Sequence, residues 1–179
     1  MGRLRKRREF LGAALAAGGL VRLPLTFAPD DVEIVEFTDA GVRANKVKVA
    51  RVKKTDAEWH KQLSSLAFDV TRRHGTETPF TGAYWNLHER GFFRCICCDT
   101  ALFSTATKFD SGTGWPSFYE KIAPENVVTH RSRSNGYVDS ELTCARCDAH
   151  LGDVFDDGPP PTGLRYCIDS IALRFVKTP

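Results

Sequence analysis

The sequence predicts a mainly β domain of antiparallel sheets, with short helices on its N-terminal side. After Gly75, glycine and proline recur between short runs of β-branched and aromatic residues, which is typical of antiparallel strands joined by loops. Two Cys-x-x-Cys pairs, at 95–98 and 144–147, lie inside this part, and a helix-start motif precedes it. With 179 residues, the chain has room for one domain of ordinary size and some additional sequence.

The additional sequence is at the N-terminus, where residues 1–28 are predicted to be an export signal. Basic residues precede an apolar run from Phe10 to Val21, and small residues follow it. A helix needs about 20 residues to span a bilayer, so this run is too short. Arg7-Arg8, just before the run, is similar to a twin-arginine signal. We therefore expect a folded, exported protein, periplasmic or otherwise extracytoplasmic and bacterial; the alternative is an uncleaved amphipathic anchor.

The charge of the chain depends on this signal. Residues 1–28 contain six of the 25 basic and one of the 22 acidic side chains, so their removal changes the formal net charge from +3 to −2. The remaining domain has no excess of basic residues to follow a phosphate backbone, which argues against nucleic-acid binding.

Residues 29–51 are predicted to be an extended lead-in, and residues 52–179 the folded domain. The lead-in is mixed and acidic up to residue 45. From Lys46 to Val52 polar and apolar residues alternate, which predicts a short strand.

Two short helices are predicted next. Thr55 and Glu58 have the spacing of a capping box, so a helix should begin there. Ser64 or Ser65 is expected to cap a second helix that reaches Thr71. The apolar side of the first helix is expected to contain Trp59, Leu63 and Leu66.

The strands expected after Gly75 are short. The candidate segments are 91–95, 101–103, 137–143 and 164–176. In the last of these, strict alternation places one set of side chains on a single face, polar at its start and apolar at its end: Arg165, Cys167, Asp169, Ile171, Leu173 and Phe175. Such a strand would lead from a site into a core.

The two Cys-x-x-Cys pairs predict a structural zinc site. Four thiolates, from Cys95, Cys98, Cys144 and Cys147, can surround Zn²⁺ tetrahedrally. Two disulfides are the alternative, but the paired spacing matches the metal better. Zinc captured in the cytoplasm would also protect these thiols before export into an oxidising compartment.

Cys167 is separate from the zinc pairs and is the candidate nucleophile. A lone cysteine is more often a buried structural residue. Here the polar neighbours Arg165 and Asp169 favour a reactive thiol, which indicates an enzyme rather than a zinc-binding interaction module.

Several motifs identify a resemblance. In chain order they are Gly75-Thr76-Glu77, Pro79-Phe80-Thr81-Gly82, Lys108-Phe109-Asp110-Ser111-Gly112, Gly114-Trp115-Pro116-Ser117-Phe118, His150-Leu151-Gly152 and Arg165-Tyr166-Cys167. Together they resemble the B-type peptide methionine sulfoxide reductases from about Val52 to Val176.

The resemblance implies two antiparallel sheets, a zinc held by the four Cys-x-x-Cys thiolates, and reduction of the R epimer of methionine sulfoxide. It assigns the attacking thiolate, and then the sulfenic acid, to Cys167. Trp115 would form an apolar wall for the sulfoxide methyl group, and His150 would be a polar partner in the pocket.

Four positions depart from the family pattern. Asp153 replaces a histidine and Asp169 an asparagine, while Asp139 replaces an arginine and Thr113 the resolving cysteine of many members. Carboxylates near Cys167 should raise its pKa unless Arg165 compensates. Asp153 or Asp169 can instead retain a proton and donate it to the sulfoxide oxygen, which predicts an acid-shifted optimum.

The departure at Thr113 leaves the regeneration of Cys167 open. We expect direct reduction by a thioredoxin-like partner, with Cys97 as a less favoured internal resolving thiol. The substrates expected are oxidised proteins or peptides, and the expected state is a monomer. The rival hypothesis is an altered family member that binds methionine-containing or oxidised segments without turnover.

Overall fold

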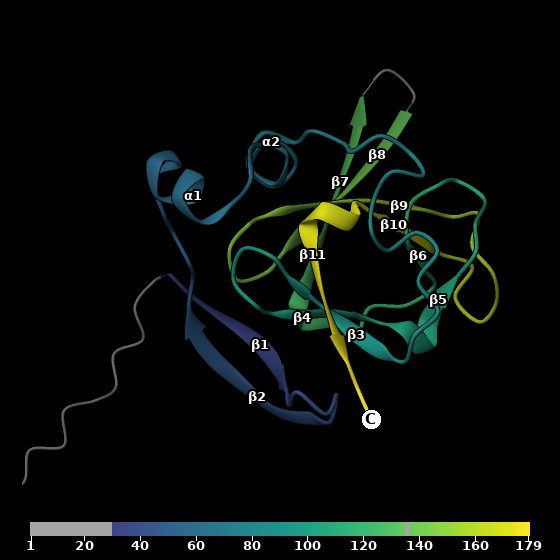
Figure 1. Ribbon diagram of the computed structural model, residues 1–179, viewed down its shortest axis with the longest axis horizontal. Coiled ribbons are helices and arrows are strands. Elements are labelled where there is room, and N and C mark those ends of the chain that lie inside the picture. Colours follow the sequence, from purple (N-terminus) through teal and green to yellow (C-terminus); the bar gives the residue numbers. More distant parts are fainter. Residues whose placement is uncertain (1–29, 135–136) are drawn as a thin grey trace, which may run out of the picture.

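The computed structural model describes residues 30–134 and 137–179 (Figure 1), and the predicted export signal lies outside them. The described strands form three sheets in which all paired strands are antiparallel. The mainly β prediction with short N-terminal helices is therefore confirmed. Within the described residues, no helix has the length and apolarity needed to cross a bilayer.

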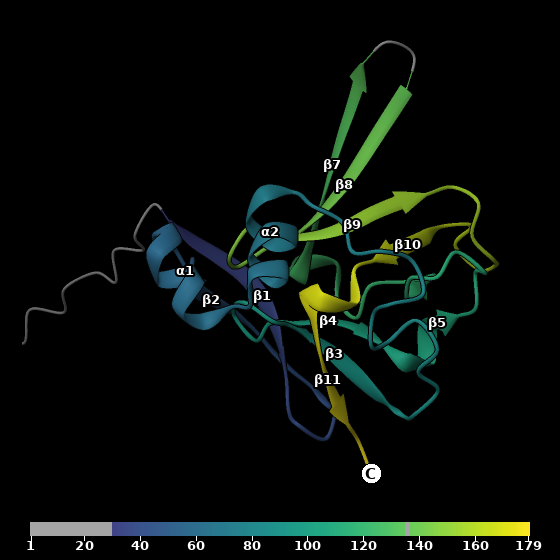
Figure 2. The same ribbon diagram turned by 45° about the horizontal axis from the view of Figure 1, so that its top comes forward.

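The largest sheet has six strands in the order β5-β6-β10-β9-β8-β7. Its strands are β5 (Lys108–Phe109), β6 (Ser117–Phe118), β10 (Arg165–Ile168), β9 (His150–Phe155), β8 (Tyr137–Cys144) and β7 (Val127–Ser134). The second sheet has the order β11-β3-β4, from β11 (Leu173–Lys177), β3 (Gly91–Cys95) and β4 (Ala101–Ser104). Strands β7 and β8 extend from the domain as a long hairpin (Figure 2).

The core lies between these two sheets and is rich in aromatic rings. Phe103 of β4 stacks on Phe118 of β6 with ring centroids 4.6 Å apart, and Phe93 of β3 meets the same ring edge-on. All three side chains are fully buried. Each such burial contributes about 1.5–3 kcal/mol, so these contacts join the two sheets firmly.

The strand predicted from Lys46 to Val52 is found as β2 (Arg43–Ala50), but the lead-in before it differs from the prediction, because it contains a second strand, β1 (Asp31–Phe37), that pairs with β2. The Asn126 side chain fixes β1 to the domain: its Oδ1 accepts from the N–H of Val35 at 2.7 Å, and its Nδ2 donates to the Val35 carbonyl at 2.8 Å. Ile34 and Val35 are both buried. A register irregularity follows Val35, so β1 lacks the strict alternation that reveals a strand in sequence.

The helices are α1 (Asp56–Gln62) and α2 (Ser65–Arg73), and both caps agree with the sequence. Thr55 forms the predicted capping box with Glu58, and Ser64 caps α2. Leu66 was wrongly placed on the apolar side of the first helix. It belongs to α2 and is 50% exposed, because the chain leaves helical geometry at Leu63 and the periodicity restarts.

The final strand also differs from the prediction, because 164–176 is not continuous. It divides into β10 and β11, which lie in different sheets, with the 3-10 turn η3 (Ser170–Ala172) between them. The buried carboxylate of Glu77 accepts the N–H groups of Ser170 and Ile171 and stabilises this turn. The predicted common face therefore ends at Asp169.

Candidate functional site

The candidate active site is a cleft of about 150 Å³ over the neighbouring strands β9 and β10, in the middle of the six-stranded sheet. It brings together residues from four separate segments of the chain. Its lining residues are Thr76, Trp115, Gly152, Asp153, Phe155, Cys167, Ile168 and Asp169.

Strand register fixes the partners of Cys167. On β10 it lies directly opposite Ser117 of β6 on one side and Asp153 of β9 on the other. Asp153 in turn lies opposite Glu141 of β8. Directly opposed residues have Cβ atoms about 4.5–5.5 Å apart, so the thiol and two carboxylates form one row across the sheet.

The close approach of β9 and β10 requires glycine at position 152. Gly152 has a φ of 137°, and a Cβ there would lie 2.1 Å from the Cys167 carbonyl oxygen. A larger residue would push the strands apart and displace the thiol.

Cys167 is half-buried, and burial raises the pKa of its thiol. The Thr113 hydroxyl, 3.9 Å from Sγ, and the charge of Arg165 oppose this rise, while the Asp169 carboxylate adds to it. The direction agrees with the prediction from sequence, but its main cause is burial rather than the carboxylates. Thr113 bonds to Ser111, which bonds to Ser117, so a chain of hydroxyls ends at the sulfur.

Asp169 is only 3% exposed, and its Oδ1 accepts the N–H of Glu77 at 2.8 Å. Burial raises the pKa of Asp169 to about 6, and the carboxylates of Glu77 and Asp153 act in the same direction. A carboxyl group with this pKa can hold a proton close to neutral pH.

Trp115 lines the cleft, and its indole Nε1 donates to the Glu77 carbonyl at 3.1 Å. This hydrogen bond satisfies the polar end of the ring and fixes its orientation. Glu77 thus orients three parts of the site. The Glu77 carbonyl accepts from Trp115, the Glu77 N–H donates to Asp169, and the Glu77 carboxylate accepts from the η3 turn. Its motif was recognised from sequence, but this positioning role was not.

Arg165 lies beside the cleft rather than among its lining residues. Its guanidinium forms a bidentate pair with Asp157, with both N···O distances 2.8 Å, and it lies over the Phe155 ring at 4.3 Å. The hydrogen bond with Asp157 raises the Arg165 pKa further. The sequence did not identify Asp157, because Asp157 meets Arg165 only when the loop after β9 folds back.

His150 is buried but is not among the lining residues of the cleft. Its Nδ1 lies 2.8 Å from Oε1 of Glu141, and its charge acts on Asp169. A role for His150 as a polar partner of the substrate stays a prediction. Asp139 pairs with Ser132 in the β7–β8 ladder, and its side chain lies outside the described part of the chain.

The four cysteines of the predicted metal site come together as expected. Their sulfur atoms all lie within 4.8 Å of one another. Cys95 to Cys147 is 3.7 Å and Cys98 to Cys144 is 3.5 Å. Sulfurs around tetrahedral zinc, with bonds of about 2.3 Å, are about 3.8 Å apart, whereas a disulfide is about 2.05 Å. The donor set thus fits Zn²⁺, and all six cysteines are free of disulfides.

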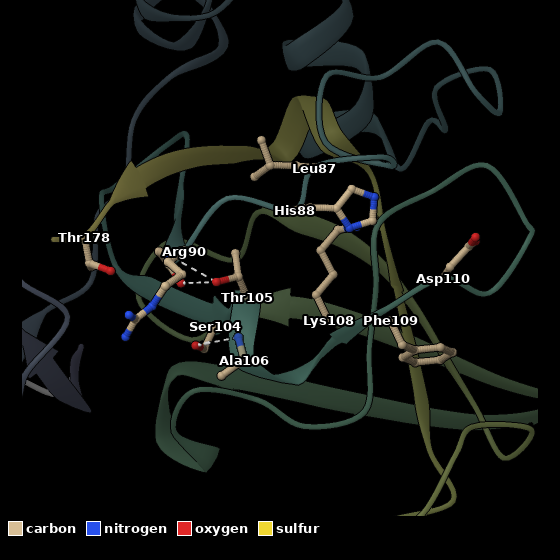
Figure 3. Close-up of a pocket in the computed structure, with 11 residues that line it drawn as sticks. Leu87, His88, Arg90, Ser104, Thr105, Ala106, Lys108, Phe109, Asp110 and Thr178 are labelled. Carbon is tan, nitrogen blue, oxygen red and sulfur yellow. Dashed lines mark hydrogen bonds between the residues drawn. The ribbon is translucent and has the colours of Figure 1, made fainter.

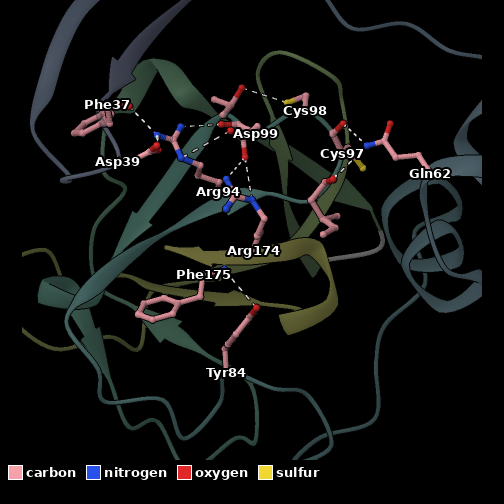
Figure 4. A network of polar contacts seen from close by, with 12 residues as sticks. Phe37, Asp39, Gln62, Tyr84, Arg94, Cys97, Cys98, Asp99, Arg174 and Phe175 are labelled. Atoms are coloured by element: carbon pink, nitrogen blue, oxygen red, sulfur yellow. Dashed lines mark hydrogen bonds and ion pairs between the residues drawn. The ribbon is translucent and has the colours of Figure 1, made fainter. Parts of the chain in front are cut away.

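Three side chains support the two loops that carry the cysteines: Gln62 and Arg72 from the helices, and Arg94 from β3 next to the first loop. Gln62 donates to the Cys97 carbonyl at 2.8 Å, and Arg94 donates to the Asp99 carbonyl at 3.0 Å (Figure 4). Arg72 of α2 similarly donates to the Cys147 carbonyl at 2.8 Å. The helices therefore brace the loops that present the cysteines.

A second hollow of about 320 Å³ lies beside β4 and β5, where Lys108 and His88 project into it (Figure 3). It shares no lining residue with the cleft at Cys167 and contains no cysteine. The smaller cleft is the better candidate because it combines a thiol, two carboxylates and an aromatic wall.

Comparisons with known proteins agree with this geometry. Residues 63–177 match the SelR domain. The peptide methionine sulfoxide reductase MsrB of Herminiimonas arsenicoxydans is 54% identical over 129 residues, which cover 72% of this chain and 94% of that protein. The protein of the same name from Agrobacterium fabrum is 52% identical over 125 residues, covering 70% and 93%. This chain therefore belongs to the family of B-type peptide methionine sulfoxide reductases.

Proposed function

We propose that this protein reduces the R-sulfoxide of methionine residues in oxidised proteins or peptides, as a monomeric repair enzyme. The observation that supports this most directly is the position of Cys167 in a cleft with Trp115, Asp153 and Asp169. Relatives named for this activity, at about 50% identity over nearly their whole length, support the same conclusion.

In the proposed reaction, the Cys167 thiolate attacks the sulfoxide sulfur while the sulfoxide oxygen is protonated. The oxygen passes to Cys167, which becomes a sulfenic acid, and methionine is released. The sulfur of the substrate is reduced by two electrons and that of the enzyme is oxidised by two.

Asp169 is the proposed donor of the proton. Its pKa of about 6 lets it hold a proton near neutral pH, and it lines the same cleft as the thiol. Trp115 would contact the substrate methyl group. Arg165, held by Asp157, would lower the energy of the thiolate by its positive charge.

Regeneration of Cys167 is proposed to use an external dithiol of the thioredoxin type. Such a donor would return the sulfenic acid to the thiol, release water and form its own disulfide. Cys97 is 4% exposed and lies inside a metal-binding loop, so it is poorly placed to reach a cleft thiol.

The zinc held by the four cysteines is proposed to be structural. Four thiolates complete the usual coordination of Zn²⁺ and leave no position for substrate. Export to an extracytoplasmic compartment remains a proposal that rests on residues 1–28, and loading of zinc before export would be consistent with it.

The deciding experiment follows each epimer of a blocked methionine sulfoxide separately, with dithiothreitol as reductant. Loss of the R epimer alone, abolished in Cys167→Ser and retained in Cys97→Ser, is the expected result. Binding without turnover would support the rival hypothesis of an altered binding protein. Equal activity of the Cys167→Ser protein would overturn the assignment of the nucleophile.

A further inference from the structure

A second group of potential metal ligands lies apart from the four cysteines. His74, Glu141 and His150 each offer one ligand atom, and these atoms all lie within 4.8 Å of one another. The two Nδ1 atoms lie 2.6 Å and 2.8 Å from the same Oε1 of Glu141. Two imidazoles and a carboxylate are ligands that suit Zn²⁺, Co²⁺ and Ni²⁺.

Each of the three residues is held by regular structure. His74 caps the C-terminus of α2 in the left-handed conformation, and its N–H bonds to the Asp69 carbonyl. Glu141 lies within β8, and His150 begins β9, against which α2 packs. Little conformational freedom would be lost on binding an ion, since the scaffold already brings the ligands together.

The site is open on one side and electrostatically suited to a cation. The side chain of His74 is 63% exposed and that of Glu141 is 26% exposed, whereas that of His150 is 8% exposed. Solvent can therefore reach the ligands and complete the coordination. The carbonyl end of α2 is negative, and Asp153 lies directly opposite Glu141. The two cations of the last turn of α2 are directed elsewhere, because Arg72 donates to the Cys147 carbonyl and Arg73 pairs with Asp69.

We propose that His74, Glu141 and His150 bind one divalent transition-metal ion, separate from the thiolate zinc site. Tetrahedral N and O ligands at about 2.0–2.1 Å from zinc are roughly 3.3 Å apart. The hydrogen-bonded atoms, now 2.6 Å and 2.8 Å apart, would thus have to separate by about 0.5–0.7 Å, and the exposed His74 ring can move. The proposal concerns binding and does not depend on the reductase activity.

The test titrates Co²⁺ into zinc-loaded Cys167→Ser protein at pH 7.5. The serine background removes the cleft thiol as a competing ligand, and the prebound zinc protects the four cysteines. We expect one equivalent to bind with a micromolar dissociation constant, by calorimetry and by visible absorption without a thiolate charge-transfer band.

The matched variants are His74→Ala and His88→Ala, both made in the serine background. His88 is also exposed, and its ring bonds to Asn86, away from the proposed site. We expect His74→Ala to weaken binding about tenfold or more and His88→Ala to leave it unchanged. Equal melting temperatures would show that both variants fold.

Three results would overturn the proposal. The first is no saturable binding up to millimolar Co²⁺. The second is binding that His74→Ala leaves unchanged. The third is a thiolate charge-transfer band, which would place the ion on cysteine.

Discussion

The two regions that contain cysteine differ in how their thiols are surrounded. In the four-cysteine cluster that fits zinc, the side chains of Cys95, Cys144 and Cys147 are buried and their loops are braced by hydrogen bonds. In the cleft, Cys167 is half-buried beside a hydroxyl, a guanidinium and carboxylates. The same side chain is a structural ligand in one place and a candidate nucleophile in the other because its neighbours and its exposure differ.

Removal of zinc should produce the largest effect. Structural zinc contributes roughly 10–16 kcal/mol of apparent binding free energy in small peptides, against about 5–15 kcal/mol for the stability of a typical domain. We expect a strong chelator, or Cys144→Ser, to unfold the domain, as measured by circular dichroism and thermal melting. Cys167→Ser is the control and should have a melting temperature close to that of the wild type. An unchanged melting temperature after chelation would show that the four cysteines are not a structural zinc site.

Substitution of Asp169 by Asn tests the chemistry of the cleft. The active form needs a protonated Asp169 and an ionised Cys167. Since the pKa of Asp169 is about 6 and that of the thiol is higher still, kcat/KM should rise to about pH 6 and then remain level up to the thiol pKa. The Asn variant should lose about a hundredfold at pH 6 and continue to rise with pH through the level region.

Asparagine keeps an oxygen to accept the Glu77 N–H, so the variant should remain folded. The raised pKa of Asp169 also has a consequence for stability. The folded state holds the Asp169 proton more tightly than the unfolded state does. The stability that depends on this proton is therefore fully present below the unfolded pKa of 3.8 and is lost as pH rises through the folded pKa of about 6. At pH 8, the melting temperature of the Asn variant should not be lower than that of the wild type. An Asn variant with an unchanged pH profile would exclude Asp169 as the acid.

Glu77→Ala tests whether one buried residue organises the cleft. The change leaves the N–H groups of Ser170 and Ile171 without an acceptor, which should cost about 1–3 kcal/mol in the free energy of unfolding. Glu89→Ala is a suitable control, because Glu89 forms an exposed ion pair with Lys177 and should cost about 0–1 kcal/mol. Equal costs by urea denaturation would argue against the special role of Glu77.

The smallest effect concerns the pKa of Cys167 itself. Because burial is the main cause of its rise, Asp169→Asn should lower the thiol pKa only slightly. The pH dependence of iodoacetamide labelling measures this, with Cys167→Ser giving the background. A return of the pKa to its ordinary value in the Asn variant would show that the carboxylate, not burial, dominates.

The features predicted correctly from sequence are those that depend on local spacing. The Cys-x-x-Cys pairs identified the four ligands now found together, and the Thr55–Glu58 spacing identified the start of α1. The short strand at 91–95 was also predicted with its observed bounds. Ligand spacing, capping and β propensity act within a few residues, so the sequence displays them directly.

The features that only the tertiary structure decided depend on contacts between distant segments. Val35 is fixed by Asn126, Arg165 by Asp157, and the break after Asp169 by Glu77. The same is true of the row that places Cys167 opposite Asp153, which requires the register of β9 on β10. By itself, the sequence determined which residue types were available for this chemistry. Strand register and burial decided which of them meet, because both arise only when the whole chain packs.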